Sequence, residues 1–486
     1  MPTMQDHADP RSGPAEAPPP RPVRRRALPV LLVFAAAAGL AGVVWAGPAD
    51  PLPVLSPVLC AGVAVAGGLL LLWSWCRRGR RWWAVTLPAL VGGTALAVGA
   101  AKVLLWRTRT VVDPYPALFL LLAGAVLLAL AGLPWTLRRG GRRGAAWAAL
   151  LAVPATLLGA GLCANREYGL YVTVGDALGR TAGLESIDEL PASPAPPTPA
   201  AHAGRGRVVS FTAPGTRSGF TARPGAAYLP PAYFTPARAD LPVLVLLPGT
   251  PGAPLHWVSS GRAVEVADAY AARHGGHAPV LIFADPNGTS TGDTECVDGP
   301  VARAETYLTA DIPAYVTRRL GIRHDPRRWG LVGFSAGGTC AIHLVLRDPT
   351  RYGHFLSIGG DAAPALATPE ETRSRLFGGS AEVQRAYDPA VLLATRRYEG
   401  VTGWFAAGTA DPHRRTTAAR LSAAARGAGV DARAFVGRGG HTWHFVRDVL
   451  QRVTPVLFTE LGTGVPAARF AAPAPRVLPP LAAPPG

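Results

Sequence analysis

Five long apolar runs in the first third of the chain constrain its fold more than any other feature. They span residues 27–46, 53–75, 82–105, 117–135 and 145–164, and each is close to the roughly 20 residues that a helix needs to cross a membrane. As a helix, each run would carry apolar side chains on every face, whereas a core helix would be amphipathic. A cleaved signal peptide does not account for them, because four runs follow the first. We therefore predict an N-terminal module of five transmembrane helices.

Arginine is distributed unevenly among the connections between these runs. Residues 21–26, 77–81 and 138–143 hold four arginines each, twelve in all, whereas residues 107–116 hold two and residues 47–52 hold none. Because short cytoplasmic loops are enriched in basic residues, we expect the N-terminus in the cytoplasm and everything after residue 164 outside. The run at 82–105 contains Pro88 and several glycines, so a re-entrant segment there is an alternative that would reverse the placement.

The rest of the chain divides by composition. Residues 1–26 are polar and Pro-rich and are expected to be a disordered cytoplasmic segment. Residues 165–206 combine a mixed segment with a Pro/Ala-rich linker, and residues 465–486 form a Pro/Ala-rich tail that we also expect to be disordered. Between them, residues 207–464 are long enough for one globular domain.

Charge and cysteine usage exclude two classes of function. The formal net charge is +17, but much of it is arginine beside the apolar runs, and no basic stripe with interleaved aromatic residues occurs, so we expect no nucleic-acid partner. None of the five cysteines forms a CxxC pair, which argues against a cysteine-based zinc site.

Short apolar runs alternate with helical patterns between residues 207 and 464. Strands are predicted at 243–247, 280–284, 330–334, 355–358, 404–407 and 434–436, with helices at 264–273, 307–319, 337–347, 416–427 and 442–451. This alternation favours a doubly wound, mostly parallel sheet. The predicted fold class is an α-helical transmembrane module followed by an α/β-hydrolase domain.

The motif Gly-Phe-Ser-Ala-Gly at 333–337 lies between a predicted strand and a predicted helix. A serine on such a tight turn needs small neighbours two residues to either side, where the backbones crowd. Its hydroxyl needs a histidine base and an acid, which should follow in that order. Ser335 is therefore the candidate nucleophile.

Candidates for the base and the acid follow late strands. His441 precedes the last predicted helix, and His444, three residues on, is its rival. Asp411 follows the strand at 404–407 and would orient the imidazole. Asp361 and Asp388 are the alternative acids. For the oxyanion hole we expect backbone N–H groups of Ala336 and Thr250, since Pro251 has none.

Several segments of the predicted domain resemble a known family. RPGAAYLPPAY at 223–233, LPVLVLLPG, DTECV, GFSAGG and GGHTW are similar to the family called "putative esterase", which includes esterase D, feruloyl esterases and mycolyltransferases. The resemblance covers residues 208–461 and implies a triad of Ser335, Asp411 and His441, with no metal or organic cofactor. Where that family often has His-Gly, this chain has Pro248-Gly249, which leaves the backbone donor unaffected.

The predicted domain also contains two cysteines and a helical insert. Cys296 and Cys340 either form a disulfide, which an extracytoplasmic position permits, or remain two buried thiols. Thr368-Pro369-Glu370-Glu371 is a typical helix start, and the stretch from there to Tyr398 is expected to cover the site.

These features predict a membrane-anchored, extracytoplasmic serine esterase that works through an acyl-enzyme. The alternatives are an acyltransferase, a lipid-directed hydrolase such as one acting on aminoacyl-phosphatidylglycerol, and an inactive fold used as a binding module. Transport by the helices is disfavoured, because Lys102, their one strongly placed charge, is near a helix end. The expected partners are an ester substrate and the membrane, and the oligomeric state stays open.

Overall fold

The computed structural model describes residues 56–75, 78–107, 117–137, 143–177, 184–190, 205–465, 469 and 472–478. The predicted apolar run at 27–46, the N-terminal segment 1–26 and most of the linker before residue 205 lie outside the described residues, as do the arginines at 21–26.

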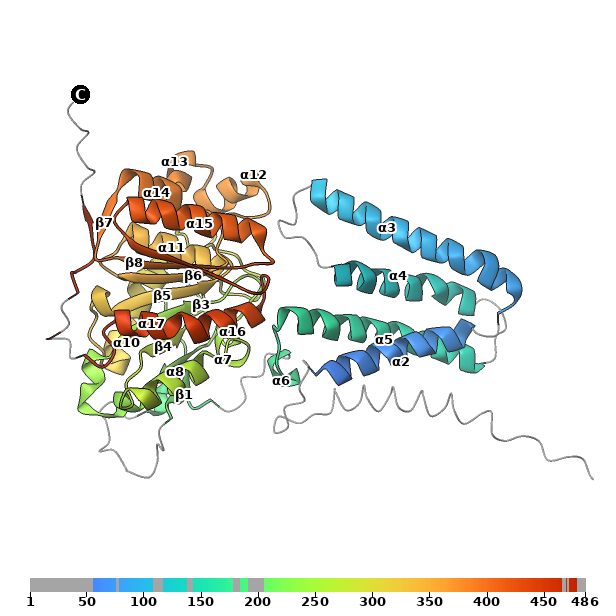
Figure 1. The fold of residues 1–486 in the computed structure, drawn as a ribbon, viewed down its shortest axis with the longest axis horizontal. Helices are drawn as coiled ribbons and strands as arrows, with labels where there is room; N and C mark the ends of the chain where they lie inside the picture. The colour runs from blue at the N-terminus through green and yellow to red at the C-terminus, as the bar shows by residue number, and fades with distance from the viewer. Residues whose placement is uncertain are drawn as a thin grey trace, which may run out of the picture.

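Four long helices form a bundle beside the α/β domain (Figure 1). They are α2 (Pro57–Trp75), α3 (Leu87–Arg107), which follows a π-helical turn η2 (Trp82–Thr86), α4 (Ala117–Leu137) and α5 (Arg143–Tyr168). Helix α5 packs against α2 and α4, and α3 packs against α4. Gly159 on α5 lies so close to Ala64 on α2 that an added Cβ would be 3.1 Å from its Cα. Small residues at a helix contact are typical of membrane bundles.

Three of these helical stretches are long and apolar enough to cross a membrane: Pro57–Trp75, Trp82–Leu104 and Trp147–Tyr168. Helix α4 contains a shorter apolar stretch, Leu120–Pro134. Large apolar side chains on this bundle face outward, among them Leu96, which is 75% exposed, and Leu121, which is 71% exposed. Such an outer surface suits a hydrocarbon surrounding better than water.

The C-terminal part is built on an eight-stranded sheet in the order β1-β2-β4-β3-β5-β6-β8-β9. Its strands are β1 (Arg207–Phe211), β2 (Gly225–Leu229), β3 (Val243–Leu247), β4 (Val280–Phe283), β5 (Trp329–Phe334), β6 (His354–Ile358), β8 (Thr402–Gly408) and β9 (Asp431–Gly437). The six strands from β4 to β9 are parallel, and β1 and β2 add an antiparallel edge. Every residue of strands β2, β3, β4, β5 and β6 is buried, as expected for a sheet covered on both faces.

Helices cover both faces of the sheet. Side chains of α10 (Ile312–Leu320), α11 (Ala336–Arg347) and α15 (Pro412–Gly427) share one core cluster with the sheet. Those of α8 (Ala263–Arg273), α16 (Trp443–Arg452) and α17 (Thr454–Glu460) share the other. The predicted doubly wound α/β fold is therefore confirmed for this part of the chain.

Short elements fill the connections. They are α6 (Val174–Ala177), η3 (Ile187–Glu189), η4 (Pro231–Phe234), η5 (Pro236–Asp240), α7 (His256–Ser259), α9 (Ala304–Thr306), η6 (Tyr307–Asp311), η7 (Pro326–Arg328), α12 (Pro369–Glu371), η8 (Thr372–Leu376), α13 (Ala381–Ala386) and α14 (Pro389–Thr395). The last four make the helical insert that follows β6, and Figure 1 shows α12, α13 and α14 at one end of the α/β domain.

The structure contains strands that the sequence analysis did not predict, at the start of the α/β domain, at the end of the helical insert and in the tail. Strands β1 and β2 were not predicted; the short run Gly225–Leu229 carries small residues and lacks strong β-branched character. Part of the tail, predicted to be disordered, forms β10 (Arg476–Leu478), which pairs with β7 (Arg397–Glu399). An ion pair between Arg476 and Glu399 joins the two strands, so backbone pairing and charge together order a Pro/Ala-rich stretch.

The segment that follows α5 rests directly on the α/β domain. The backbone carbonyl of Arg166, near the end of α5, is 2.8 Å from Nε2 of His444 on α16. The hydroxyl of Ser260, after α7, donates to the carbonyl of Leu170. The ring of Tyr171 lies edge-on to that of His256, with centroids 5.5 Å apart. The last apolar helix of the bundle is thus joined to α7 and α16 by direct contacts.

Candidate active site

Ser335 occupies a strained turn between β5 and α11. Its backbone has φ 58° and ψ −125°, a conformation that residues with a side chain rarely adopt. The Ser335 N–H donates to the carbonyl of Ile358 on the neighbouring strand β6, at 2.9 Å. This bond ties the turn to the carboxyl edge of the sheet, where ligands bind in open α/β folds.

The glycines around Ser335 are required by space. A Cβ on Gly333 would lie 1.8 Å from the carbonyl oxygen of Gly337. A Cβ on Gly337 would lie 2.2 Å from the carbonyl oxygen of Leu247 at the end of β3. Both gaps are far below any real contact, so strand and helix approach this closely only because neither residue has a side chain.

The structure brings His441 and Asp411 together. His441 lies in the loop between β9 and α16, and its Nδ1 is 3.4 Å from Oδ2 of Asp411. The His441 ring also packs on the ring of Phe334, with centroids 4.7 Å apart, and Phe334 directly precedes Ser335. His441 thus lies beside the residue that precedes Ser335. Among the described residues, however, the Ser335 hydroxyl makes no hydrogen bond to His441. Catalytic hydrogen bonds are often loose without substrate.

Asp411 is held as a charged acceptor. It caps α15, accepting from the Arg414 N–H at 3.1 Å, and its side chain is 5% exposed. Burial raises the pKa of Asp411, but the hydrogen bond from His441, the Arg414 N–H and the Arg414 charge together bring that pKa below its ordinary value. A buried carboxylate that stays ionised suits the role of orienting an imidazole.

The alternative acids lie elsewhere. Asp361 follows β6, pairs with Arg414 at 3.4 Å, and its backbone N–H donates to Oγ1 of Thr339 at 2.9 Å. No hydrogen bond or ion pair joins Asp361 and His441 in the described part of the chain. Asp388 caps α14 by accepting from the Ala390 N–H at 2.8 Å, within the helical insert. His444, the rival base, faces the end of α5 and the guanidinium of Arg447, 2.8 Å away.

The loop after β3 lies against Ser335. A Cβ on Gly249 would be 2.8 Å from Cβ of Ser335, which places the Thr250 backbone beside the nucleophile. The Thr250–Pro251 peptide is cis. Among the described residues, nothing accepts a hydrogen bond from the backbone N–H of Thr250 or of Ala336, the first residue of α11. Two free N–H groups near one serine are the elements of an oxyanion hole.

A buried ion pair that the sequence analysis did not identify fixes this loop. The guanidinium of Arg223 donates to the carbonyl of Gly252 at 2.8 Å and to Oδ1 of Asp285 at 2.6 Å. Asp285, just after β4, also accepts from the backbone N–H groups of Arg223 and Asn287. The Asn287 amide donates to Oγ1 of Thr250 at 2.9 Å. The sequence signals were the position of Asp285 at a strand end and the place of Arg223 at the start of a segment that resembles the family, and neither signal pairs the two residues.

The loop after β4 is joined to α11 by a disulfide and carries two buried carboxyl groups, Asp293 and Glu295. The sulfurs of Cys296 and Cys340 are bonded in the structure, which links the loop after β4 to α11. Burial raises the pKa of Asp293 to about 6. Hydrogen bonds from the Glu295 N–H and from Thr250 lower this pKa, but burial has the larger effect. Burial likewise raises the pKa of Glu295 well above its ordinary value, and the charges of Asp293 and Asp361 add to this. Oε2 of Glu295 is buried without a hydrogen-bond partner among the described residues.

The described part of the chain contains no group of three or more His, Cys, Asp or Glu side chains that could hold a metal ion.

Comparison with known proteins identifies the family. A family model described as "Putative esterase" matches residues 221–448. An uncharacterized protein of Corynebacterium glutamicum is 32% identical over 402 residues, which cover 80% of this chain and 92% of that protein. The chain belongs to this esterase family. The alignment with the Corynebacterium glutamicum protein covers more of this chain than the part after Ala164. The similarity therefore extends into the apolar helices of this chain.

Three solved structures illustrate what this chain is similar to. A ferulic acid esterase is 19% identical, with a TM-score of 0.43, and covers 53% of this chain and 98% of its own. An S-formylglutathione hydrolase from Agrobacterium tumefaciens is 18% identical, with a TM-score of 0.44, over 54% and 97%. MPT51 of Mycobacterium tuberculosis is 17% identical, with a TM-score of 0.36, over 49% and 94%. The family assignment supports a serine hydrolase that acts on carboxylic esters.

We predict that Gly333→Ala destabilises the esterase by roughly 3 kcal/mol or more, because its Cβ would overlap the Gly337 carbonyl. The apparent Tm of the purified full chain should fall, and labelling by a fluorophosphonate should be lost. Gly427→Ala, at the end of α15, is the matched control, since its Cβ would meet open space. An unchanged Tm for Gly333→Ala would show that the turn can relax.

A second prediction concerns pH. Asp293 has a raised pKa in the folded state, so its charge disfavours folding above pH 6, and this penalty disappears as the pH falls below the unfolded value near 4. Asp293→Asn should therefore raise the apparent Tm at pH 8 by a few degrees, and the gain should shrink at pH 5. Glu382→Gln, an exposed acid, should show no such pH dependence. An equal gain at both pH values would contradict the prediction.

Proposed function

We propose that Ser335, His441 and Asp411 form the catalytic triad of this esterase. The observation that carries the proposal is the combination of the strained Ser335 turn with the Nδ1–Oδ2 distance of 3.4 Å between His441 and Asp411. Asp361, which like Asp411 pairs with Arg414, has no hydrogen bond or ion pair with His441 among the described residues. Asp411 would hold the ring in the tautomer whose Nε2 accepts a proton.

In the proposed mechanism, Oγ of Ser335 attacks the ester carbonyl carbon while Nε2 of His441 takes the hydroxyl proton. The N–H groups of Ala336 and Thr250 stabilise the negative oxygen of the tetrahedral intermediate. The C–O bond to the alcohol then breaks, and His441 returns the proton to the leaving alcohol. Water, activated in turn by His441, attacks the acyl-enzyme and releases the acid and free Ser335. An acyltransferase would use a second alcohol in place of water.

Membrane anchoring is the second part of the proposal. Five transmembrane helices within residues 27–164 would carry a catalytic domain at 207–464 through the connecting segment 165–206, with the N-terminus in the cytoplasm and the catalytic domain outside. Three apolar stretches of membrane-spanning length and the arginine distribution support this placement. The Cys296–Cys340 bond supports it too, because stable disulfides belong to oxidising compartments.

One observation favours an aminoacyl ester, as in aminoacyl-phosphatidylglycerol, as a second candidate substrate. Asp293 lies within 3.4 Å of Oγ1 of Thr250, next to the proposed oxyanion hole, and its neighbour Glu295 has an unpartnered buried oxygen. An ammonium group on the acyl part would offset the carboxylate charge there. The inactive-module alternative has no comparable support.

The triad is tested by turnover of a short soluble ester. Ser335→Ala should lower kcat by about a thousandfold or more, because no other group is placed to form the acyl-enzyme. Asp411→Asn should lower kcat far more than Asp361→Asn, which serves as the matched control at the same edge of the sheet. A larger loss from the Asp361 variant would move the acid to that residue, and full activity of Ser335→Ala would end the proposal.

The orientation is tested by protease protection on intact cells with a C-terminal epitope tag. External protease should remove the tag without lysis, and non-reducing peptide mapping should recover the peptides of Cys296 and Cys340 as one linked species. Protection of the tag until lysis, together with free thiols on both cysteines, would place the domain in the cytoplasm.

A further inference from the structure

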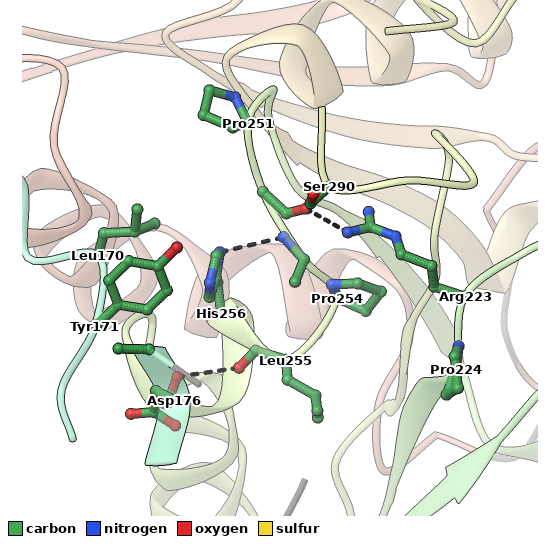
Figure 2. Close-up of a pocket in the computed structure, with 14 residues that line it drawn as sticks. Leu170, Tyr171, Asp176, Arg223, Pro224, Pro251, Pro254, Leu255, His256 and Ser290 are labelled. Atoms are coloured by element: carbon green, nitrogen blue, oxygen red, sulfur yellow. Dashed lines mark hydrogen bonds between the residues drawn. The ribbon is translucent and has the colours of Figure 1, made fainter. Parts of the chain in front are cut away.

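A cavity of about 520 Å³ lies between the segment that leaves the helical bundle and the loop after β3 (Figure 2). One wall comes from Leu170, Tyr171 and Asp176, just beyond α5. The opposite wall comes from residues 251–256 with Arg223 and Pro224. In Figure 2 the rings of Tyr171 and His256 lie next to each other, in the edge-on contact described above. The volume is in the range of small-molecule sites.

The polar groups around the cavity are largely committed to protein partners. The Arg223 guanidinium binds Asp285 and the Gly252 carbonyl. A carboxylate oxygen of Asp176 accepts from the N–H groups of Val172 and Thr173. Nδ1 of His256 accepts from the Ala253 N–H at 3.2 Å, and burial lowers the pKa of His256 to about 4, so its ring is neutral.

What remains on the walls is mostly hydrocarbon: Leu170, Pro224, Pro251, Pro254 and Leu255, with the ring of Tyr171. An apolar wall of this kind gains free energy by covering the CH₂ groups of a chain, at about 0.8 kcal/mol for each group buried. It offers little to an anionic headgroup, because the Arg223 guanidinium is paired with Asp285 and the Asp176 carboxylate would repel a negative charge.

The position of the cavity links it to both the bundle and the chemistry. Leu170 and Tyr171 come two and three residues after α5, whose stretch Trp147–Tyr168 is apolar enough to cross a membrane. On the other side, Pro251 directly follows Thr250, and Gly249 touches Ser335. In this loop, residues 251–256 therefore line the cavity, while residue 249 contacts Ser335.

We propose that this cavity binds the hydrocarbon chain of an ester drawn from the membrane while its carbonyl reaches Ser335. The substrate class is then an amphiphilic, lipid-derived ester rather than a small water-soluble one. This inference rests on the proposed catalytic role of Ser335, and it adds a chain-binding subsite to that role.

The test compares labelling of Ser335 by two probes, an ethyl fluorophosphonate and a hexadecyl fluorophosphonate, on the full chain in detergent micelles. Leu255→Glu places a charge on the cavity wall. Its control is Val258→Glu, in the short helix α7 that directly follows Leu255. Both residues are half-buried and pack against the same core cluster, but of the two only Leu255 lines the cavity.

Leu255→Glu should lower the labelling rate of the long probe about tenfold relative to the short probe, since covering even a few CH₂ groups is worth that factor. Val258→Glu should leave the ratio of the two rates at the parent value. An unchanged ratio in Leu255→Glu would overturn the chain-binding site. Absence of labelling by both probes in the parent protein would instead overturn the catalytic role of Ser335, so the two failures are distinguishable.

A second variant covers the case in which Leu255→Glu does not fold. Ala177→Trp, on the exposed short helix α6, adds a large ring to the cavity from the side of the bundle without disturbing the core. It should lower the same ratio by blocking the chain. A parent-like ratio in this variant would also contradict the proposal.

Discussion

The backbone of Ser335 is the constraint on which the arrangement of this site depends. A serine at φ 58° is unfavourable by roughly 1–3 kcal/mol, so the surrounding structure must hold it there. The hydrogen bond from its N–H to Ile358 and the side-chain-free contacts at Gly333 and Gly337 do so. They also set the distance between β3, β5 and α11, because Gly337 packs on the end of β3. The loop that carries Thr250 begins at that same point, and so the geometry of the proposed oxyanion hole follows from the packing of the nucleophile turn.

The parallel strands were predictable because each is a short apolar run buried on both faces. The run 243–247 matches β3, and the others differ from the predictions by one to three residues at an end. Strand β2 escaped prediction because its residues are small, and it is stabilised by pairing on both sides with β1 and β4. Helix α15 begins four residues earlier than predicted, since Asp411 acts as its cap and Pro412 as its first residue.

The local parts of the candidate site could be read from sequence, whereas its long-range parts could not. Ser335 and His441 stand in motifs with a fixed place between strand and helix. The choice between Asp411 and Asp361 needs the spatial relation of β6 and β8 to the His441 loop, which only the folded sheet supplies. The Arg223–Asp285 pair joins residues 62 positions apart, and although Arg223 begins a segment that resembles the family, nothing in the sequence pairs it with Asp285. The same is true of the contact between His444 and Arg166, which are 278 positions apart.

That last contact has a consequence for kinetics. His444 follows His441 by three residues and binds the end of α5, so the catalytic edge of the sheet is docked on a helix that we propose to be membrane-spanning. An enzyme held in this way would meet the membrane-derived ester that we propose as its substrate by lateral diffusion in two dimensions. Its rate would then follow the mole fraction of ester in the lipid surface, and diluting that surface with inert lipid would slow the reaction even when the bulk amount of ester stays constant.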